Sequence, residues 1–442
     1  MVRSLAVKRH VAYFRRCLSL LPYPYTAVDS SRLALVFFAI SALDILGALN
    51  PTTNGGQQQQ QQEEEAGTVT AEEIANWTEW IYSACLLPTR DAFRCSPATN
   101  AGPRDNDDND DNADYDAGHV AGTYFALGAL LVLRDDLGRI DRAGMMRWLR
   151  RCQRPDGSFA AGVIGGFDHD RREREHEWFG ERDQRFNYCA AAIRHIISKS
   201  TSSAASDDDI DVSAVRAYVL SCVGYDGGIG FTPSGFAESH AGLTYCGVAT
   251  LRLLGDNVLA ESMPRLPGLL RWLLAHQVAQ VNDNDDDSDD DDDVVVAGFN
   301  GRLNKQVDTC YSFWVGGTLA LLPANSSSFS HTGLMGLSQV RPNVRYLLSK
   351  TQDELTGGFA KVQGDRSDVL HSCLALTSLG LCADVIRAVG NNDKCDNDMD
   401  QDIKAIIGLK SIDAGLCVTQ ATRDYCEQLR QAWTTNAHFV NT

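Results

Sequence analysis

The chain has 442 residues, of which 44% are hydrophobic. This is enough for a large buried core and excludes general disorder. The formal net charge is −18, but Asp105–Asp116, Asp207–Asp211 and Asp283–Asp293 together hold 20 aspartates, so the rest of the chain is close to neutral. Neither an acidic partner-binding surface nor a basic nucleic-acid-binding stripe follows. We find no apolar run of the roughly 18 residues that cross a bilayer, and expect no stable membrane insertion.

The N-terminal 28 residues contain five basic and no acidic side chains. A mitochondrial transit peptide has this composition, but Val11, Phe14, Leu18 and Leu21 recur at helical spacing and favour an amphipathic first helix. No small-residue cleavage site follows, as a secretory signal would require. The 13 cysteines are scattered and form no CxxC pair. Reduced cysteines in the cytoplasm are the simplest interpretation.

Low-complexity segments rich in Gln, Glu, Asp, Asn or Ser, or of mixed charge, interrupt the chain. Their composition cannot bury enough apolar surface to order them. We interpret them as loops inserted between the helices of one domain that spans residues 1–442. These inserts lie at about residues 54–66, 100–116, 168–183, 200–211 and 282–293.

Between the inserts a unit repeats: the end of an amphipathic helix, a glycine turn, and a second helix rich in small residues. Such a repeat predicts helix pairs stacked side by side. A fifth copy is expected around Trp77–Tyr82. The four clear copies have their turns at Asp156-Gly157-Ser158, Asp226-Gly227-Gly228, Gly298-Phe299 and Gly357-Gly358-Phe359.

The second helices are apolar on nearly all sides, as in Gly242–Leu254, Thr309–Leu322 and Val369–Leu381. A helix without a polar face is buried all round. Buried inner helices inside a layer of amphipathic outer helices predict an all-α fold, an α/α barrel of repeated helix hairpins. No strand pattern of any length competes with this interpretation.

Polar residues at the starts of the inner helices should meet at one mouth of this barrel. Asp308 and Cys310 open one inner helix, and His371 opens the last. A carboxylate, a thiolate and an imidazole can hold zinc with a fourth position open for a substrate, as in catalytic zinc sites. The alternative is that Asp308 only caps its helix and Cys310 only packs in the core.

A second polar group lies at the neighbouring turns. His240 opens another inner helix, and Arg302 and Lys305 precede Asp308. Cations and helix N-termini that face one point form an anion site, into which a diphosphate would fit. Solvated turns carry similar charges, but the occurrence of both groups at equivalent turns is harder to ascribe to chance.

Long motifs in these turns resemble the β subunits of the protein prenyltransferases. Arg9-His10-Val11 and Ser31-Arg32-Leu33 fit that family as well, so the resemblance covers nearly the whole chain outside the inserts. The motifs are Glu238-Ser239-His240, the run Gly301-Arg302-x-Asn304-Lys305-x-Val307-Asp308-x-Cys310-Tyr311, and Gly357-Gly358-Phe359-Ala360-Lys361 with His371 ten residues after the lysine.

The resemblance implies an obligate heterodimer with a prenyltransferase α subunit and one Zn²⁺ held by Asp308, Cys310 and His371. This zinc would bind the cysteine thiol of a C-terminal CaaX motif and lower its pKa, so that the thiolate attacks C1 of the lipid. Arg185 resembles a cavity residue on the peptide side. The isoprenoid diphosphate would be bound, and its leaving charge stabilised, by His240, Arg302, Lys305 and Tyr311.

Two positions distinguish the enzymes of the family. Lys361 stands where farnesyltransferase has an aspartate that helps to hold Mg²⁺, and where the type I geranylgeranyltransferase has lysine, so Mg²⁺ is not expected to be required. Ala34 stands where farnesyltransferase has a tryptophan, which leaves room for one more isoprene unit. Phe38 and Leu370 resemble the wall of a pocket for a C-terminal leucine.

The resemblance thus favours the type I geranylgeranyltransferases, with geranylgeranyl diphosphate as lipid and CaaX-terminated small GTPases of Rho, Rac and Rap type as substrates. A farnesyltransferase β subunit is the first alternative. A terpenoid cyclase shares the barrel but needs acids in the cavity, and Asp107–Asp111 matches the DDxxD of terpenoid synthases only by chance in a low-complexity tract. A non-catalytic helical-repeat adaptor would have lost some of the site residues.

Overall fold

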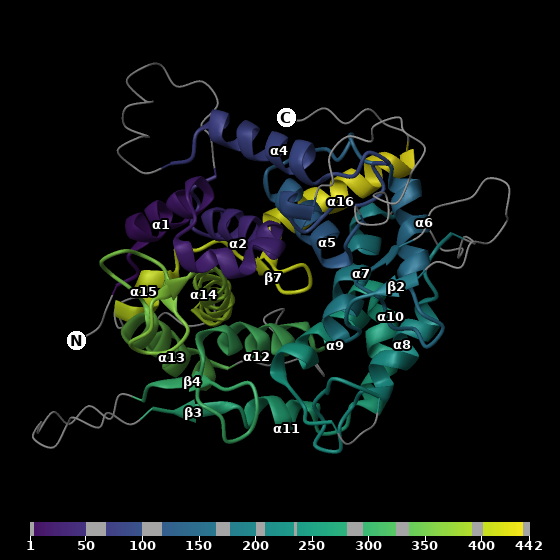
Figure 1. Ribbon diagram of the computed structural model, residues 1–442. Helices are drawn as coiled ribbons and strands as arrows, with labels where there is room; N and C mark the ends of the chain where they lie inside the picture. Colours follow the sequence, from purple (N-terminus) through teal and green to yellow (C-terminus); the bar gives the residue numbers. More distant parts are fainter. Residues whose placement is uncertain are drawn as a thin grey trace, which may run out of the picture.

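The computed structural model describes residues 4–49, 68–99, 117–164, 177–199, 208–233, 237–280, 295–323, 336–390 and 401–435. Helices dominate this part of the chain, and the main ones form two concentric layers (Figure 1). The inner layer consists of α2 (Arg32–Ile45), α5 (Val120–Val132), α7 (Gln184–Ile197), α9 (Ala241–Leu254), α12 (Thr309–Leu321) and α14 (Val369–Gly390). The outer layer consists of α1 (Val7–Ser19), α4 (Ala71–Cys85), α6 (Arg142–Cys152), α8 (Val212–Ser221), α11 (Leu269–Leu274) and α13 (Leu337–Tyr346).

The inner helices form a closed ring. Each packs against the next in chain order, and α14 packs back against α2 (Figure 1). Six helix pairs are therefore present in the described chain, one more than the sequence predicted. The additional pair is α1 and α2, which are joined by the 3₁₀ segment Tyr23–Ser31 rather than by a glycine turn, so the repeat pattern does not reveal it. The all-α barrel is confirmed, whereas the single domain from residue 1 to 442 stays a prediction.

Glycines in two of these turns pack on the backbone of the next outer helix. Gly157 has φ +89°, and a Cβ there would lie 2.0 Å from the carbonyl oxygen of Ala214 in α8. Gly357 has φ +83°, and its Cβ would lie 2.2 Å from the carbonyl oxygen of Arg9 in α1. Side chains cannot occupy these positions without moving the neighbouring helix. The second contact also joins the last turn to the first helix and helps to close the ring.

Short two-stranded antiparallel sheets supplement the helices at the turns and in the C-terminal region. Their registers pair Gly162 with Phe179, Gln277 with Phe299, Phe359 with Asp368 and Ile412 with Thr419. The strands are β1 (Gly162–Ile164) with β2 (Glu177–Phe179), β3 (Gln277–Ala279) with β4 (Ala297–Phe299), β5 (Phe359–Ala360) with β6 (Ser367–Asp368), and β7 (Ile412–Asp413) with β8 (Val418–Thr419). The remaining helices include α10 (Asp256–Ser262), α15 (Gln401–Ile406) and α16 (Gln420–Thr435).

Two predicted inserts are ordered at their C-terminal ends, where the prediction was wrong. Within 168–183, β2 pairs with β1, and buried Asp183 caps α7 by accepting a hydrogen bond from the Arg185 amide at 2.8 Å. Within 200–211, Asp209 forms an ion pair with Arg194 at 2.6 Å, and Asp211 caps α8. Capping and charge pairing fix these residues where burial of apolar surface cannot. The inserts at 54–66, 100–116 and 282–293, and with them Asp107–Asp111, lie outside the described residues.

Two helical segments, Tyr23–Ile45 and Val369–Val389, are long and apolar enough to cross a membrane. The expectation that no segment reaches that length is therefore wrong. Most of the second segment is buried in the protein, because α14 is an inner helix that contacts α12, α13 and α2. The first segment contains α2, which packs against α1, α5 and α14. Burial in the ring accounts for much of this apolar character without a bilayer.

Candidate active site

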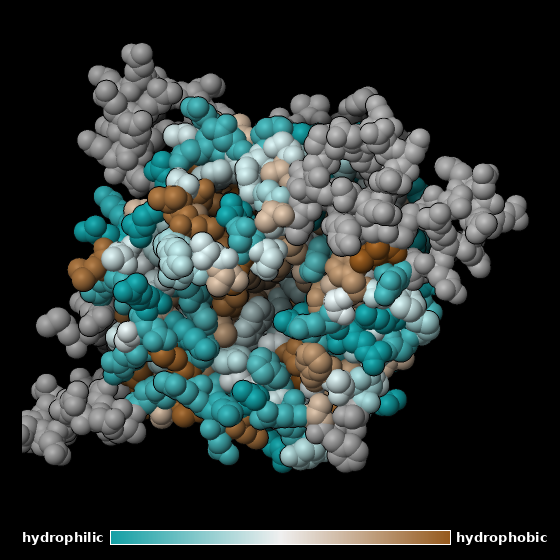
Figure 2. Space-filling model, in the orientation of Figure 1, coloured by the Kyte–Doolittle hydropathy of each residue, from teal (hydrophilic) through white to brown (hydrophobic). Residues whose placement is uncertain are grey.

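Side chains that cap the inner helices stand at one mouth of the barrel. Asp308 accepts a hydrogen bond from the Cys310 amide at 2.9 Å, and the Nδ1 atom of His240 accepts one from the Gly242 amide at 3.0 Å. All inner helices begin at the same end of the barrel. Their capping residues therefore place polar groups around one opening. In the space-filling view a hollow opens near the middle of one face, where hydrophobic side chains show between hydrophilic ones (Figure 2).

Asp308, Cys310 and His371 come together at this mouth, with one potential ligand atom from each within 4.8 Å of the others. The Nε2 atom of His371 lies 3.2 Å from a carboxylate oxygen of Asp308. Its Nδ1 atom lies 2.6 Å from the Asp368 carboxylate, which orients the imidazole so that Nε2 faces the cluster. Sulfur, nitrogen and oxygen donors in this arrangement fit a metal ion of the zinc type. The roles predicted for the three residues stay predictions.

The charges of this cluster favour a bound cation. Burial disfavours the imidazolium of His371, but the carboxylates of Asp308 and Asp368 outweigh burial and raise its pKa to about 9. Burial and the Asp308 carboxylate both raise the pKa of the Cys310 thiol well above its usual range. A divalent ion would reverse both preferences, because it stabilises a thiolate and a neutral imidazole. Lys361 is exposed, with its Nζ atom 3.9 Å from the Asp308 carboxylate.

His240, Tyr311 and Arg302 form a second group of polar side chains at the mouth. The Nε2 atom of His240 lies 3.1 Å from the Tyr311 hydroxyl, and Arg302 pairs with Glu238 at 2.9 Å. Burial and then the Arg302 charge lower the pKa of His240, so its ring is neutral at pH 7. Since Nδ1 already accepts from Gly242, Nε2 carries the proton and donates to Tyr311. Lys305 is exposed in the turn after Arg302.

This hydrogen-bond direction leaves the Tyr311 hydroxyl proton free for an anion at the mouth. Tyr311→Phe removes that donor and leaves the ring in place. Loss of one donor to a developing negative charge typically lowers kcat by about 10²-fold, and we expect an effect of this size with little change in the KM of the substrate that carries the anion. Steady-state kinetics of the variant test it. An unchanged kcat would show that Tyr311 only packs against His240.

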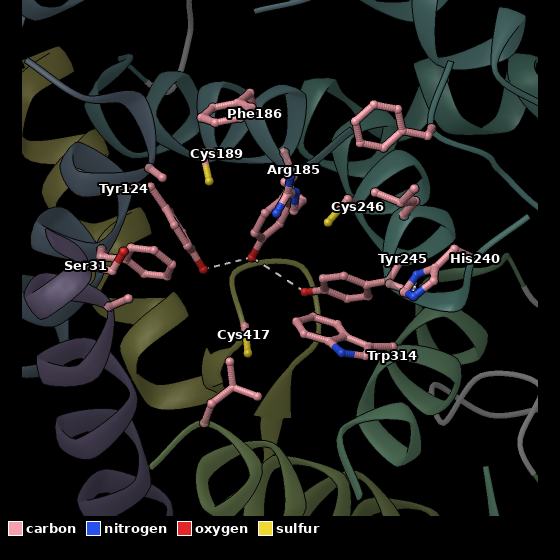
Figure 3. Close-up of a pocket in the computed structure, with 18 of the residues that line it drawn as sticks. Ser31, Tyr124, Arg185, Phe186, Cys189, His240, Tyr245, Cys246, Trp314 and Cys417 are labelled. Atoms are coloured by element: carbon pink, nitrogen blue, oxygen red, sulfur yellow. Dashed lines mark hydrogen bonds between the residues drawn. The ribbon is translucent and has the colours of Figure 1, made fainter. Parts of the chain in front are cut away.

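A cavity of about 860 Å³ leads inward from the mouth. All four residues predicted for the lipid and peptide pocket line it: Ala34, Phe38, Arg185 and Leu370. His240 and Arg302 line it too, whereas Lys305, Tyr311 and Lys361 lie outside its lining. Asp183 and Glu181 form ion pairs with Arg185, which Figure 3 shows among the residues that line the cavity. The structure thus brings most of the predicted binding residues to one cavity, and their individual roles stay predictions.

Three tyrosines in this cavity were missed by the sequence analysis. The hydroxyls of Tyr124 and Tyr188 are 2.8 Å apart, and that of Tyr245 lies 3.5 Å from Tyr188 (Figure 3). Their repeat position could have revealed them, because each follows the capping residue of its inner helix by the same interval of five residues. The corresponding caps are His119, Asp183 and His240.

Residues 5–418 match the model of the prenyltransferase alpha-alpha toroid domain. The chain is also 31% identical over 386 residues to the geranylgeranyl transferase type-1 subunit beta of Arabidopsis thaliana, and 84% of each protein is covered. The chain belongs to the protein prenyltransferase β-subunit family. The predicted resemblance is thereby confirmed, and the metal-type cluster and the apolar cavity described above are features of a member of this family.

Other relatives support the type I branch of the prenyltransferases. The type-1 subunit beta of Dictyostelium discoideum is 28% identical, with 83% of this chain and 88% of the relative covered. The farnesyltransferase subunit beta of Pyricularia oryzae is 27% identical, with 84% of this chain but 62% of the relative covered. A solved structure, Candida albicans protein geranylgeranyltransferase-I complexed with GGPP, superposes with a TM-score of 0.70 at 26% identity, covering 97% of this chain and all of its own. The farnesyltransferase alternative is less well supported.

Proposed function

We propose that this prenyltransferase subunit is the catalytic β subunit of a heterodimeric protein geranylgeranyltransferase type I. It transfers geranylgeranyl from its diphosphate to the cysteine thiol of CaaX proteins that end in leucine. The observation that carries the proposal is the cluster of Asp308, Cys310 and His371 beside the mouth of the apolar cavity, with His240 and Arg302 at the same mouth. A metal-type donor set, an anion site and a lipid-sized cavity are the parts that this reaction needs.

The donor set fits zinc, and a bound Zn²⁺ would lower the pKa of the substrate thiol, so that a thiolate is present at neutral pH. His240, Tyr311, Arg302 and Lys305 bind the diphosphate and place the isoprenoid in the cavity. The thiolate sulfur forms a bond to C1 as the bond from C1 to the diphosphate oxygen breaks, and the diphosphate leaves with that electron pair. The tyrosine hydroxyl and the cations stabilise the charge that develops.

Transfer to a peptide that ends in Cys-a-a-Leu tests this proposal, with the chain co-expressed with a prenyltransferase α subunit. We expect a thioether product that mass spectrometry places on the peptide cysteine. The same peptide with serine in place of that cysteine should accept no lipid. Equal labelling of both peptides would contradict the thiolate mechanism.

Lys361 is proposed to supply a positive charge at the position where the resemblance implies that farnesyltransferases carry an aspartate that helps to hold Mg²⁺. Its ammonium lies 3.9 Å from Asp308 at the edge of the cluster and is exposed to solvent, so it can reach a leaving diphosphate. We expect transfer by the wild-type enzyme to be independent of Mg²⁺. Lys361→Asp should lower kcat about 10²-fold without Mg²⁺ and recover part of it at millimolar Mg²⁺. A magnesium titration of both proteins checks this, with Lys361→Arg as the charge-preserving control, and a wild-type enzyme that needs Mg²⁺ would contradict it.

Heterodimerisation with an α subunit is proposed from the relatives, which are named as β subunits. Cytoplasmic location, a single domain over residues 1–442, and substrates among Rho, Rac and Rap type GTPases complete the proposal. The twelve described cysteines are free, as a reducing compartment requires. The second candidate is a farnesyltransferase β subunit, and the small side chain of Ala34 in the cavity wall weighs against it.

A further inference from the structure

One residue lines the cavity from a part of the chain far from the barrel mouth. Most lining residues belong to the first two turns of the inner helices or to the turns before them. Cys417 instead lies in the loop between β7 and β8, close to the C-terminal hairpin drawn inside the ring (Figure 3). This hairpin is anchored at the far end of α2, where Thr419 donates a hydrogen bond to Asp44 at 2.6 Å and the Lys410 amide to Ile45 at 3.1 Å. The loop therefore closes the cavity at the end opposite the mouth.

Tyrosines of the cavity hold this loop in place. The Tyr245 hydroxyl donates to the carbonyl oxygen of Ala414 at 2.7 Å, and the Tyr124 hydroxyl donates to that of Leu416 at 2.9 Å. Asp413 accepts a hydrogen bond from the Leu416 amide at 2.7 Å. These buried hydrogen bonds satisfy the carbonyl groups of Ala414 and Leu416 in a largely apolar cavity, and they fix the position of the loop.

We propose that Cys417 is the stop that limits how long an isoprenoid the cavity accepts, with Tyr124 and Tyr245 as positioning residues for the loop that carries it. This inference rests on the proposed function, which places the diphosphate beside His240 and Arg302 at the mouth. A lipid anchored there extends inward, and its terminal carbons reach the floor last. Ala34 leaves room in the wall for the last isoprene unit, and the side chain at the floor limits extension beyond that unit.

The backbone conformation at Cys417 allows variants that change the size of the side chain without straining the backbone. Its φ is +56°, a left-handed conformation in which glycine is unstrained, so Cys417→Gly removes the side chain without a backbone penalty. Cys417→Met lengthens the side chain without branching at Cβ. Cys417→Ser keeps the depth of the floor and serves as the control. A difference of one or two carbon-sized groups in an apolar pocket typically changes kcat/KM by about 10-fold or more.

The experiment compares these variants as heterodimers with three diphosphates: farnesyl, geranylgeranyl, and a geranylgeranyl analogue with extra methyl groups at its terminal carbons. Cys417→Met should lose about 10-fold or more in kcat/KM for geranylgeranyl and keep its farnesyl rate, and Cys417→Gly should gain about 10-fold for the analogue. Cys417→Ser keeps the size of the side chain and should keep the wild-type ratios of kcat/KM among the three lipids. Equal losses for every lipid, or Met and Gly variants with wild-type preferences, would overturn the proposal.

Further measurements distinguish misfolding of a variant, failure of the proposed stop and failure of the proposed function. If Cys417→Met does not fold, as judged by its melting temperature, the Cys417→Gly result decides alone. Tyr245→Phe removes the hydrogen bond to the Ala414 carbonyl and should raise the ratio of kcat/KM for the analogue to kcat/KM for geranylgeranyl about threefold or more, whereas a loss of stability alone would lower both values equally. A wild-type heterodimer that uses none of the three lipids would reject the proposed function itself, whereas wild-type transfer with unaltered preferences in the variants rejects only the stop.

Discussion

Cys310→Ala is expected to abolish binding of the proposed zinc ion and to lower prenyl transfer by about 10³-fold, because activation of the substrate thiol by a metal is worth several kcal/mol of barrier. Cys310 is buried beside Asp308 and contributes the only sulfur of the described cluster. Without it the remaining carboxylate and imidazole pair with each other at 3.2 Å, as they already do here. Metal analysis of the purified heterodimer and single-turnover rates measure the two losses.

Cys373→Ala is the matched control for this experiment. It removes another buried thiol from an inner helix, two residues from His371, but takes away no group of the cluster. It should keep its zinc and its rate. Treatment of the wild-type enzyme with a chelator should reproduce the Cys310→Ala defect, and added Zn²⁺ should restore only the wild type. Full zinc content and full activity in Cys310→Ala would show that Cys310 is only a core residue.

Ala34→Trp is expected to convert the lipid preference from geranylgeranyl to farnesyl. Ala34 lines the cavity near Phe37 and Phe38, and an indole there would fill space that the last isoprene unit needs. We expect kcat/KM for geranylgeranyl diphosphate to fall about 100-fold, whereas that for farnesyl diphosphate changes little or rises. Competition between the two labelled diphosphates in one reaction measures the ratio directly.

Ala34→Ser separates this steric effect from any disturbance of α2. Serine adds one atom, so the lipid preference should stay with geranylgeranyl. A tryptophan variant that melts at the wild-type temperature and still prefers geranylgeranyl would show that the lipid tail runs elsewhere in the cavity. The floor at Cys417 would then be the main limit on chain length.

Local patterns in the sequence predicted the barrel and most of the candidate site. The apolar runs after each glycine turn predicted the inner helices, because a helix with no polar face must be buried. Asp308, Cys310 and His371 were predicted to meet because inner helices of a closed ring begin at one mouth, and their ligand atoms do lie together. The sequence did not predict the first helix pair, because the 3₁₀ segment between its helices lacks the glycine turn that marks the other pairs.

The floor of the cavity could not be predicted in this way. Cys417 reaches the cavity through contacts between the C-terminal hairpin and the inner helices, and the hydrogen bonds from Tyr124 and Tyr245 end on backbone carbonyls that carry no sequence signal. The sequence also did not predict that the C-terminal ends of two inserts are ordered. Asp183 and Asp211 are single capping residues at the ends of a mixed-charge insert and an acidic insert, and a prediction from average composition cannot detect single residues.

The most direct test of the account is transfer by the co-expressed heterodimer from equal amounts of labelled farnesyl and geranylgeranyl diphosphate to a peptide ending in Cys-a-a-Leu. The reaction is run with zinc, with and without Mg²⁺. The account predicts geranylgeranyl transfer that requires zinc and is unaffected by magnesium. Farnesyl transfer that rises with magnesium would contradict the roles given to Ala34 and Lys361, and no transfer from a zinc-loaded heterodimer would contradict the catalytic proposal as a whole.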